Sequence, residues 1–421
     1  MLPKGEPSAR SYRDLLHQTE TLHEGAAILA AELGYNHEAF KWAEKGKTLL
    51  LQQQFAQSGN NLQDAWEFPQ VSYDKELQQS LQEESAAVLF FCVGTGRTLA
   101  LLLDPIETEP KSFFVDLKEK DLQETKLAKG LWPSSGAGES QFIQFLSYLS
   151  DKLLAPLAEV LEDIINRCDV LYIVPDSRLY LVPFSSLALN GKPLIEYDHC
   201  SLALIPSVSL WQKCRQRRLL DNERSCLVVG TGSANEFSFA DQARAIMNGC
   251  NWKKTPDYLL DDEGRVTKER IWKAAKTRTV LHFSCHGMEE PMPLDTLSAL
   301  HLILSDNEKW YAKDVFNHKN ELSAELVFLN ACMSGRFKLH EGLAIGGFWE
   351  AFLHAGATTI IGTLAEVHPE DAEQLARSFY QTWLKGNITK ARALQIAQQE
   401  LRRNKPNSFH WARYILIGDH R

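Results

Sequence analysis

Six short apolar runs alternate with longer amphipathic segments in the second half of this chain, and this alternation is its strongest constraint on fold. The runs occupy residues 170–174, 227–229, 280–283, 326–329, 359–362 and 414–417. The amphipathic segments predict helices over 241–247, 268–275, 344–354, 370–384 and 390–402. Runs this short are strands rather than helices, and strands joined through helices form crossover units of a parallel sheet. The sequence therefore predicts an α/β fold whose mainly parallel sheet is flanked by helices.

The first part of the chain has a different character. Residues 11–57 have a helical pattern, with Leu33-Gly34 near the end of one helix and Ala39-Phe40 opening the next. That layout is typical of one tetratricopeptide unit, although an ordinary helical hairpin explains it equally well. A β-hairpin at 87–103 and helices at 142–149 and 156–165 follow. We therefore expect a helical segment at 1–60, a non-catalytic part at 61–169 and a catalytic part at 170–421.

Composition excludes several classes of function. The net charge of −9 is unsuited to nucleic acid, whose phosphates require clustered basic residues. The N-terminus lacks the pattern of a signal peptide, and no apolar stretch has the ~18 residues that a membrane span needs. The eight cysteines are scattered, and several fall within strand-like runs. Buried thiols of a reducing compartment fit this distribution, so we expect a cytoplasmic protein.

Two of the predicted strands end at reactive side chains. The run at 280–283 is followed by His286, and the run at 326–329 by Cys332. If these strands are neighbours in a parallel sheet, both side chains emerge at its carboxyl edge, where open α/β sheets place their sites. An imidazole beside a thiol can hold the sulfur as a thiolate nucleophile. The pair therefore predicts a Cys-His dyad, although either residue alone would more often be structural.

The residues around the dyad suit acyl transfer. Gly287 leaves the backbone after the histidine free of a Cβ atom, so its N–H can approach a developing oxyanion. The N–H of Cys332 would be the second donor. The histidine precedes the cysteine by 46 residues, compatible with the ~50 residues of caspase-type peptidases.

At this point the sequence resembles the CHAT family, caspase-like domains that are attached to tetratricopeptide repeats and are related to separase and the caspases. The resemblance begins near residue 86, and its landmarks lie at 173–176, 179–184, 205–207, 282–287, 330–335, 341–343, 355–357 and 411–419. It implies that His286 is a general base and Cys332 a nucleophile. The implied activity is endopeptidase cleavage of protein substrates through an acyl-enzyme, with no metal or organic cofactor. It also implies that a protein partner or a loop rearrangement activates the enzyme.

Four further residues are candidates for a substrate pocket. Many family members carry a tryptophan and an acidic residue where this chain has Ala365 and His368, which puts substrate preference in doubt. His368 could be a second catalytic imidazole, but a surface loop residue explains it better. Asp176 follows a strand and could line a specificity pocket, but a turn residue explains it better. Glu341 could fix a cleft loop or favour the start of the next helix.

Other interpretations of these patterns are weaker. His282, Cys285 and His286 suggest zinc ligands, but adjacent strand residues point to opposite faces. Residues 230–232 form a Gly-Thr-Gly loop without the third glycine of a dinucleotide fingerprint. The polar segment 288–323 is expected to be a regulatory loop or self-cleavage site. The main rival function is a catalytically silent signalling or scaffold module that binds protein partners; a helical-repeat adaptor has too few repeats.

Overall fold

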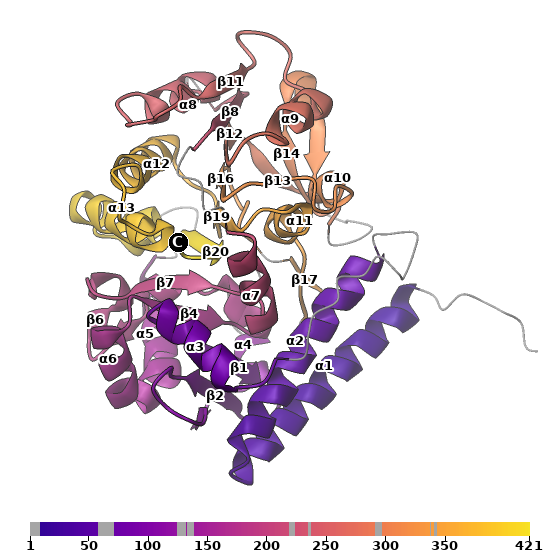
Figure 1. Cartoon of the computed structure of the whole chain (residues 1–421), viewed down its shortest axis with the longest axis vertical. Helices are drawn as coiled ribbons and strands as arrows, with labels where there is room; N and C mark the ends of the chain where they lie inside the picture. Colours follow the sequence, from indigo (N-terminus) through magenta and orange to yellow (C-terminus); the bar gives the residue numbers. More distant parts are fainter. Residues whose placement is uncertain are drawn as a thin grey trace, which may run out of the picture.

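The protein is built on one large sheet (Figure 1). The computed structural model describes residues 9–57, 71–123, 132, 139–218, 224–234, 237–290, 297–336, 338–340 and 343–421. Eleven strands form the sheet. In spatial order they are β11 (Asp257–Leu260), β8 (Cys226–Thr231), β12 (Val280–Cys285), β16 (Leu326–Asn330), β19 (Thr359–Thr363), β20 (Tyr414–Gly418), β7 (Ser201–Leu204), β4 (Val170–Val174), β1 (Ala86–Val93), β2 (Thr98–Leu103) and β3 (Lys111–Val115).

The predicted fold class is confirmed. Seven of the ten strand interfaces are parallel. The three antiparallel interfaces join β1 to β2, β2 to β3 and β19 to β20. All six predicted apolar runs are strands of this sheet, and the predicted hairpin is the β1–β2 pair.

Helices cover both faces of the sheet. Figure 1 shows α8 (Phe239–Met247), α12 (Pro369–Trp383) and α13 (Lys390–Asn404) on one side of the half of the sheet that contains β8, β12, β16 and β19. On the other side lie α9 (Lys268–Ala275), α10 (Ala312–Phe316) and α11 (Phe348–Ala355). The remaining short and medium helices include α3 (Lys75–Glu83), α4 (Glu119–Gln123), α5 (Glu139–Leu149), α6 (Ala158–Arg167), α7 (Val208–Gln216) and α14 (Ser408–Trp411).

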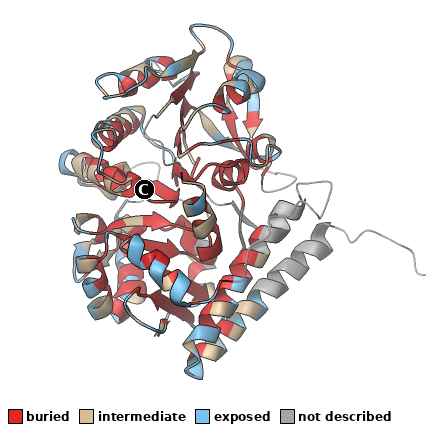
Figure 2. Ribbon diagram, viewed as in Figure 1, coloured by how far each residue is buried: buried red, intermediate tan, exposed pale blue. Residues whose placement is uncertain are grey.

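The strands read as continuous apolar runs because both of their faces are buried. In β1, Phe91 and Val93 belong to one hydrophobic cluster, and Phe90 and Cys92 belong to a second one. Alternate strand residues point to opposite faces, so the two clusters are the cores above and below the sheet. Figure 2 shows the buried strands running through the centre of the molecule.

The N-terminal helices dock on the sheet through buried charges. α1 (Ala9–Glu32) and α2 (Asn36–Gln57) form a helical hairpin. From α2, Lys47 pairs with the buried carboxylate of Asp176, just beyond β4. Glu44 accepts hydrogen bonds from the backbone N–H groups of Val208 (3.0 Å) and Ser209 (2.8 Å) at the start of α7. The hairpin is thus tied to the body at two buried points.

Two expectations for the second half were wrong. The segment expected to be one polar loop contains a small sheet of β13 (Gly287–Glu289), β14 (Leu300–Ile303) and β15 (Lys309–Tyr311), followed by α10. The helix expected over 344–354 begins only at Phe348, because residues 343–345 form β18, which pairs with β17 (Lys338–His340). The intervening Gly346 adopts a φ of 58°, which ends the strand and delays the helix.

Within the described ranges, no helix is long and apolar enough to span a bilayer. All eight cysteines fall inside those ranges, and each carries a free thiol.

Candidate active site

The strands that carry the predicted dyad are direct neighbours. β12 and β16 pair in parallel with Ser284 opposite Asn330. His286 and Cys332 each lie two residues beyond this matched pair, at the carboxyl edge of the sheet. The structure therefore brings both residues to the same edge.

Gly287 shows how closely the two strand ends approach. A Cβ atom at this position would lie 2.0 Å from the carbonyl oxygen of Cys332 and 3.2 Å from its backbone nitrogen. Real Cβ atoms do not approach other heavy atoms so closely, so only glycine fits against the cysteine backbone in this geometry. The residue after the histidine thus lies directly on the peptide unit of Cys332.

A backbone contact fixes the tautomer of His286. Its Nε2 atom lies 2.6 Å from the carbonyl oxygen of Ser233, and a carbonyl only accepts hydrogen bonds. Nε2 is therefore the protonated nitrogen of the neutral ring, and the lone pair is on Nδ1. The edge of the ring packs against Phe239, with 4.9 Å between the ring centroids. The contact with Ser233 leaves Nδ1 available as a base.

A set of hydrogen bonds holds the loop that carries Cys332. The hydroxyl of Thr363 donates to the carbonyl of Ala331 (2.8 Å), and that of Ser334 donates to Leu329 (2.9 Å). The residue after the cysteine, Met333, adopts a φ of 57°, which is unfavourable for a side chain of its size. The surrounding bonds therefore sustain a strained turn at the candidate nucleophile.

In the described part of the chain, the thiol of Cys332 forms no hydrogen bond with His286. Its Sγ lies 4.0 Å from the carbonyl oxygen of Val367, at the contact limit for a sulfur donor. Burial raises the pKa of this thiol; Glu366 adds to the rise, and Arg413 opposes it. Catalytic contacts are often incomplete without substrate, so the lack of this hydrogen bond is compatible with a dyad.

The ladder between β13 and β14 leaves the N–H of Gly287 unused. The N–H of Ile303 donates to the carbonyl of His286 (3.0 Å), and the N–H of Glu290 donates to Ala299 (2.8 Å). Antiparallel pairs alternate between bonded and non-bonded positions, so Gly287 occupies a non-bonded one. Its N–H points away from β14, as an oxyanion donor would require.

The four pocket candidates lie in different places. Ala365 is buried beside the dyad, where its carbonyl accepts a hydrogen bond from the Met333 N–H (3.3 Å). His368 is exposed at the start of α12. Asp176 is fully buried against Lys47, and β4 is separated from β16 by four strand spacings, about 19 Å. Glu341 lies outside the described residues.

His282 and Cys285 have surroundings of their own. His282 is buried between the hydroxyls of Tyr380 and Ser284, each 3.1 Å away, and burial lowers its pKa to about 3. Cys285 is buried in the core on the other face of the sheet. In the residues that the structure describes, no group of three His, Cys, Asp or Glu side chains is arranged to hold a metal ion.

Sequence reasoning missed several residues of the site. Ser233 and Phe239 fix the imidazole, and Val367 and Arg413 surround the thiol. The Gly-Thr-Gly loop that leads to Ser233 was the available signal for the first pair. A charged residue directly before the apolar run at 414–417 was the signal for Arg413.

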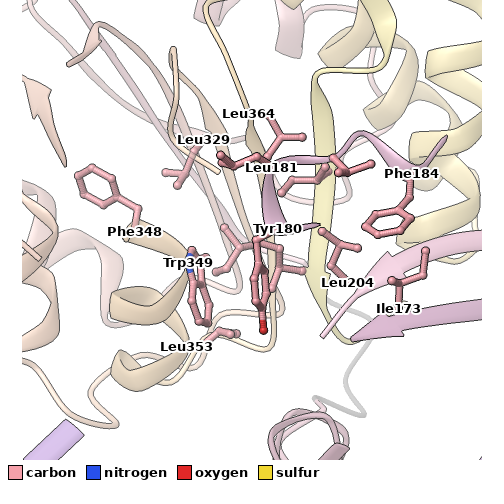
Figure 3. Close-up of a cluster of buried hydrophobic side chains, with 14 of the residues drawn as sticks. Ile173, Tyr180, Leu181, Phe184, Leu204, Leu329, Phe348, Trp349, Leu353 and Leu364 are labelled. Carbon is pink, nitrogen blue, oxygen red and sulfur yellow. The ribbon is translucent and has the colours of Figure 1, made fainter. Parts of the chain in front are cut away.

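A cluster of buried hydrophobic side chains packs next to the Cys332 loop and the loop between β19 and α12. Figure 3 shows Leu329 and Leu364, which precede the Cys332 loop and the β19–α12 loop, together with Leu181. These side chains come from three separate segments of the chain. Their packing keeps the two loops side by side.

The parallel sheet, with histidine and cysteine at neighbouring strand ends, defines the class of caspase-like cysteine peptidase folds. More particularly, the chain belongs to the CHAT domain family, whose profile matches residues 144–419. This confirms the resemblance seen in the sequence.

Solved structures with similar folds include two crystal structures of the Saccharomyces cerevisiae separase–securin complex. Both have a TM-score of 0.64 and 12% sequence identity, and they cover 96% and 99% of this chain. This chain spans only 36% and 38% of the length of those separase chains. The Arg-specific cysteine proteinase gingipain R (RgpB) of Porphyromonas gingivalis is 14% identical, with a TM-score of 0.45 over 70% of this chain and 69% of that one. No curated protein sequence matches the chain.

Proposed function

We propose that this chain is a cysteine endopeptidase in which His286 is the general base and Cys332 the nucleophile. The observation that carries the proposal is the contact of Gly287 with the Cys332 backbone, which places the two strand ends against each other. The Ser233 contact supports it, since it leaves Nδ1 of His286 free to accept a proton.

The chemistry follows from these positions. Nδ1 of His286 takes the thiol proton, and the thiolate of Cys332 attacks the carbonyl carbon of a peptide bond. The N–H groups of Gly287 and Cys332 stabilise the tetrahedral oxyanion. The imidazolium then protonates the leaving amine, and water, deprotonated by the same imidazole, releases the acyl group from sulfur. Each step uses only groups of the protein, the substrate and water.

The substrates would be proteins, and a rearrangement would precede cleavage. The thiol lies near the Val367 carbonyl rather than the imidazole, so the β19–α12 loop or the cysteine side chain has to shift. A protein partner could supply that change; the separase structures of similar fold are complexes with securin. Eight free thiols also fit the cytoplasmic location expected from the sequence.

One observation favours the alternative of a silent scaffold module. The thiol is partly buried, with a raised pKa, and is not hydrogen-bonded to the histidine in the described structure. In a binding module the same fold would present loops to protein partners without a reactive sulfur.

Labelling with a thiol-reactive peptidyl electrophile separates the two functions. We expect selective modification of Cys332, lost in Cys332→Ala and strongly slowed in His286→Ala, with matching loss of cleavage in a peptide library. Cys250→Ala is the control, because Cys250 is also only partly buried but lies away from the dyad. Labelling spread over the other cysteines, or cleavage that persists in Cys332→Ala, would contradict the peptidase.

A further inference from the structure

The segment after β19 forms a bridge between two parts of the chain. On one side, the N–H of Leu364 donates to the carbonyl of Arg413 (2.8 Å), and the Glu366 carbonyl accepts from the Arg413 guanidinium. On the other side, the Ala365 carbonyl accepts from the Met333 N–H, and the Val367 carbonyl faces the Cys332 sulfur. The four residues 364–367 therefore contact Arg413 and the cysteine loop alternately, as a strand contacts two neighbours.

Arg413 is an unusual residue for this position. Only 6% of it is exposed, and no carboxylate in the described part of the chain forms an ion pair with it. Its guanidinium lies between the rings of Trp132 (5.7 Å) and Phe409 (5.8 Å), and its Nε has no hydrogen-bond partner among the described residues. A buried unpaired cation is costly, so its retention calls for a function that uses the charge.

We propose that Arg413 is a positioning residue for Cys332: its guanidinium holds the 364–367 bridge, whose Val367 carbonyl faces the sulfur, against the cysteine loop. This deepens the proposed peptidase function and rests on it, but the effect on the thiol is measurable without any cleavage.

The charges that surround the sulfur fit this role. Glu366 faces the thiol from the bridge and disfavours a thiolate, whereas Arg413 favours it. Asp371 of α12, the nearest buried acid to Arg413, is already paired with Lys405 and His410. Cys285 of β12 and Tyr414 of β20 also interact electrostatically with Cys332, but burial raises the pKa of each, so both stay neutral near pH 7. His286 at the end of β12 and His368 at the start of α12 lie at the same edge, where Arg336 of the cysteine loop is paired with Glu289 of β13 (3.1 Å).

The test is the pH dependence of Cys332 alkylation by iodoacetamide, followed by mass spectrometry of the full-length protein. In Arg413→Met we expect the midpoint of the rate profile to rise by about one pH unit, which makes alkylation roughly tenfold slower near neutral pH. Arg413→Lys keeps the charge and should stay closer to the wild type. Arg217→Met is the matched control, because Arg217 also donates to a backbone carbonyl, that of Leu353 (3.2 Å), in another part of the fold.

A second variant keeps the proposal testable if Arg413→Met does not fold, as judged by circular dichroism. Glu366 is exposed, and Glu366→Gln removes the charge that opposes Arg413, so the midpoint should fall. A folded Arg413→Met with an unchanged or faster profile would overturn the proposal, as would an unchanged midpoint in Glu366→Gln. If labelling by the peptidyl electrophile spreads over the other cysteines but the midpoints shift as expected, the peptidase function fails while the role of Arg413 stands.

Discussion

At the residue scale, the site depends on a few contacts that join separate segments. The position of His286 and Cys332 at one sheet edge could be predicted from sequence, because each follows an apolar strand and the ends of neighbouring parallel strands meet at one edge. The contacts of Ser233 and Arg413 could not be predicted. Ser233 contacts His286 through its backbone carbonyl, and Arg413 contacts the carbonyl of Glu366 in a distant loop. Neither kind of contact produces a periodic pattern in the sequence.

Gly287 gives the sharpest prediction at this scale. In Gly287→Ala the added Cβ has to displace the Cys332 carbonyl from 2.0 Å, so we expect a loss of about 3 kcal/mol in unfolding free energy together with loss of cleavage. Urea denaturation and peptide cleavage measure the two effects. Gly96→Ala is the control, because a Cβ there meets nothing within 4 Å. Equal stability of the two variants would show that the strand ends are not in contact.

At the element scale, the long helices and the fully buried strands were predictable, and the short pieces were not. β7 and β11 have only four residues each, too few for a pattern to stand out from a loop. The small sheet of β13, β14 and β15 was missed for the same reason. The docking of α2 on β4 was also hidden, because it uses charged residues that a sequence pattern assigns to the surface.

The buried ion pair between Lys47 of α2 and Asp176, just beyond β4, predicts a strong energetic coupling between these two residues. Lys47→Met leaves the carboxylate of Asp176 buried without its cation, so we expect a loss of about 3–5 kcal/mol in unfolding free energy. Adding Asp176→Asn to this variant should recover part of that loss, and urea denaturation of the single and double variants measures the coupling. Lys41→Met, which removes an exposed pair with Glu38, should cost less than about 1 kcal/mol. Additive losses in the double variant would argue against the pair.

At the scale of the whole molecule, stability should depend on pH through buried carboxyl groups. Glu350 is 1% exposed, and neither of its carboxyl oxygens has a hydrogen-bond partner among the described residues. Burial raises its pKa from 4.5 to about 8. Between these values the folded state holds a proton that the unfolded state has lost, so the unfolding free energy falls as pH rises.

Glu350→Gln should remove this dependence. The wild type should lose up to about 1.4 kcal/mol per pH unit relative to the variant between pH 4.5 and 8, so that the variant is the more stable protein near pH 8. Denaturation curves at several pH values give the difference in unfolding free energy between the variant and the wild type. Buried histidines such as His282 have the opposite pH dependence, but they are present in both proteins, so their effect cancels in this difference. Glu370→Gln, an exposed change on α12, should follow the wild type. If the unfolding free energies of Glu350→Gln and the wild type changed in parallel with pH, the Glu350 carboxyl would have to lie in a polar environment, and the prediction would be wrong.

The position of β20 has a consequence for biosynthesis. This strand comes after all the others in the chain, yet it lies in the middle of the sheet, between β19 and β7. Until residues 414–418 leave the ribosome, the nascent chain can form only two separate sheets of five strands, each with an open edge. Arg413 and Tyr414 arrive with the same segment, and the Tyr414 hydroxyl donates to Asn330 (2.9 Å) beneath the cysteine. The strand that joins the two five-stranded parts of the sheet therefore also completes the surroundings of Cys332.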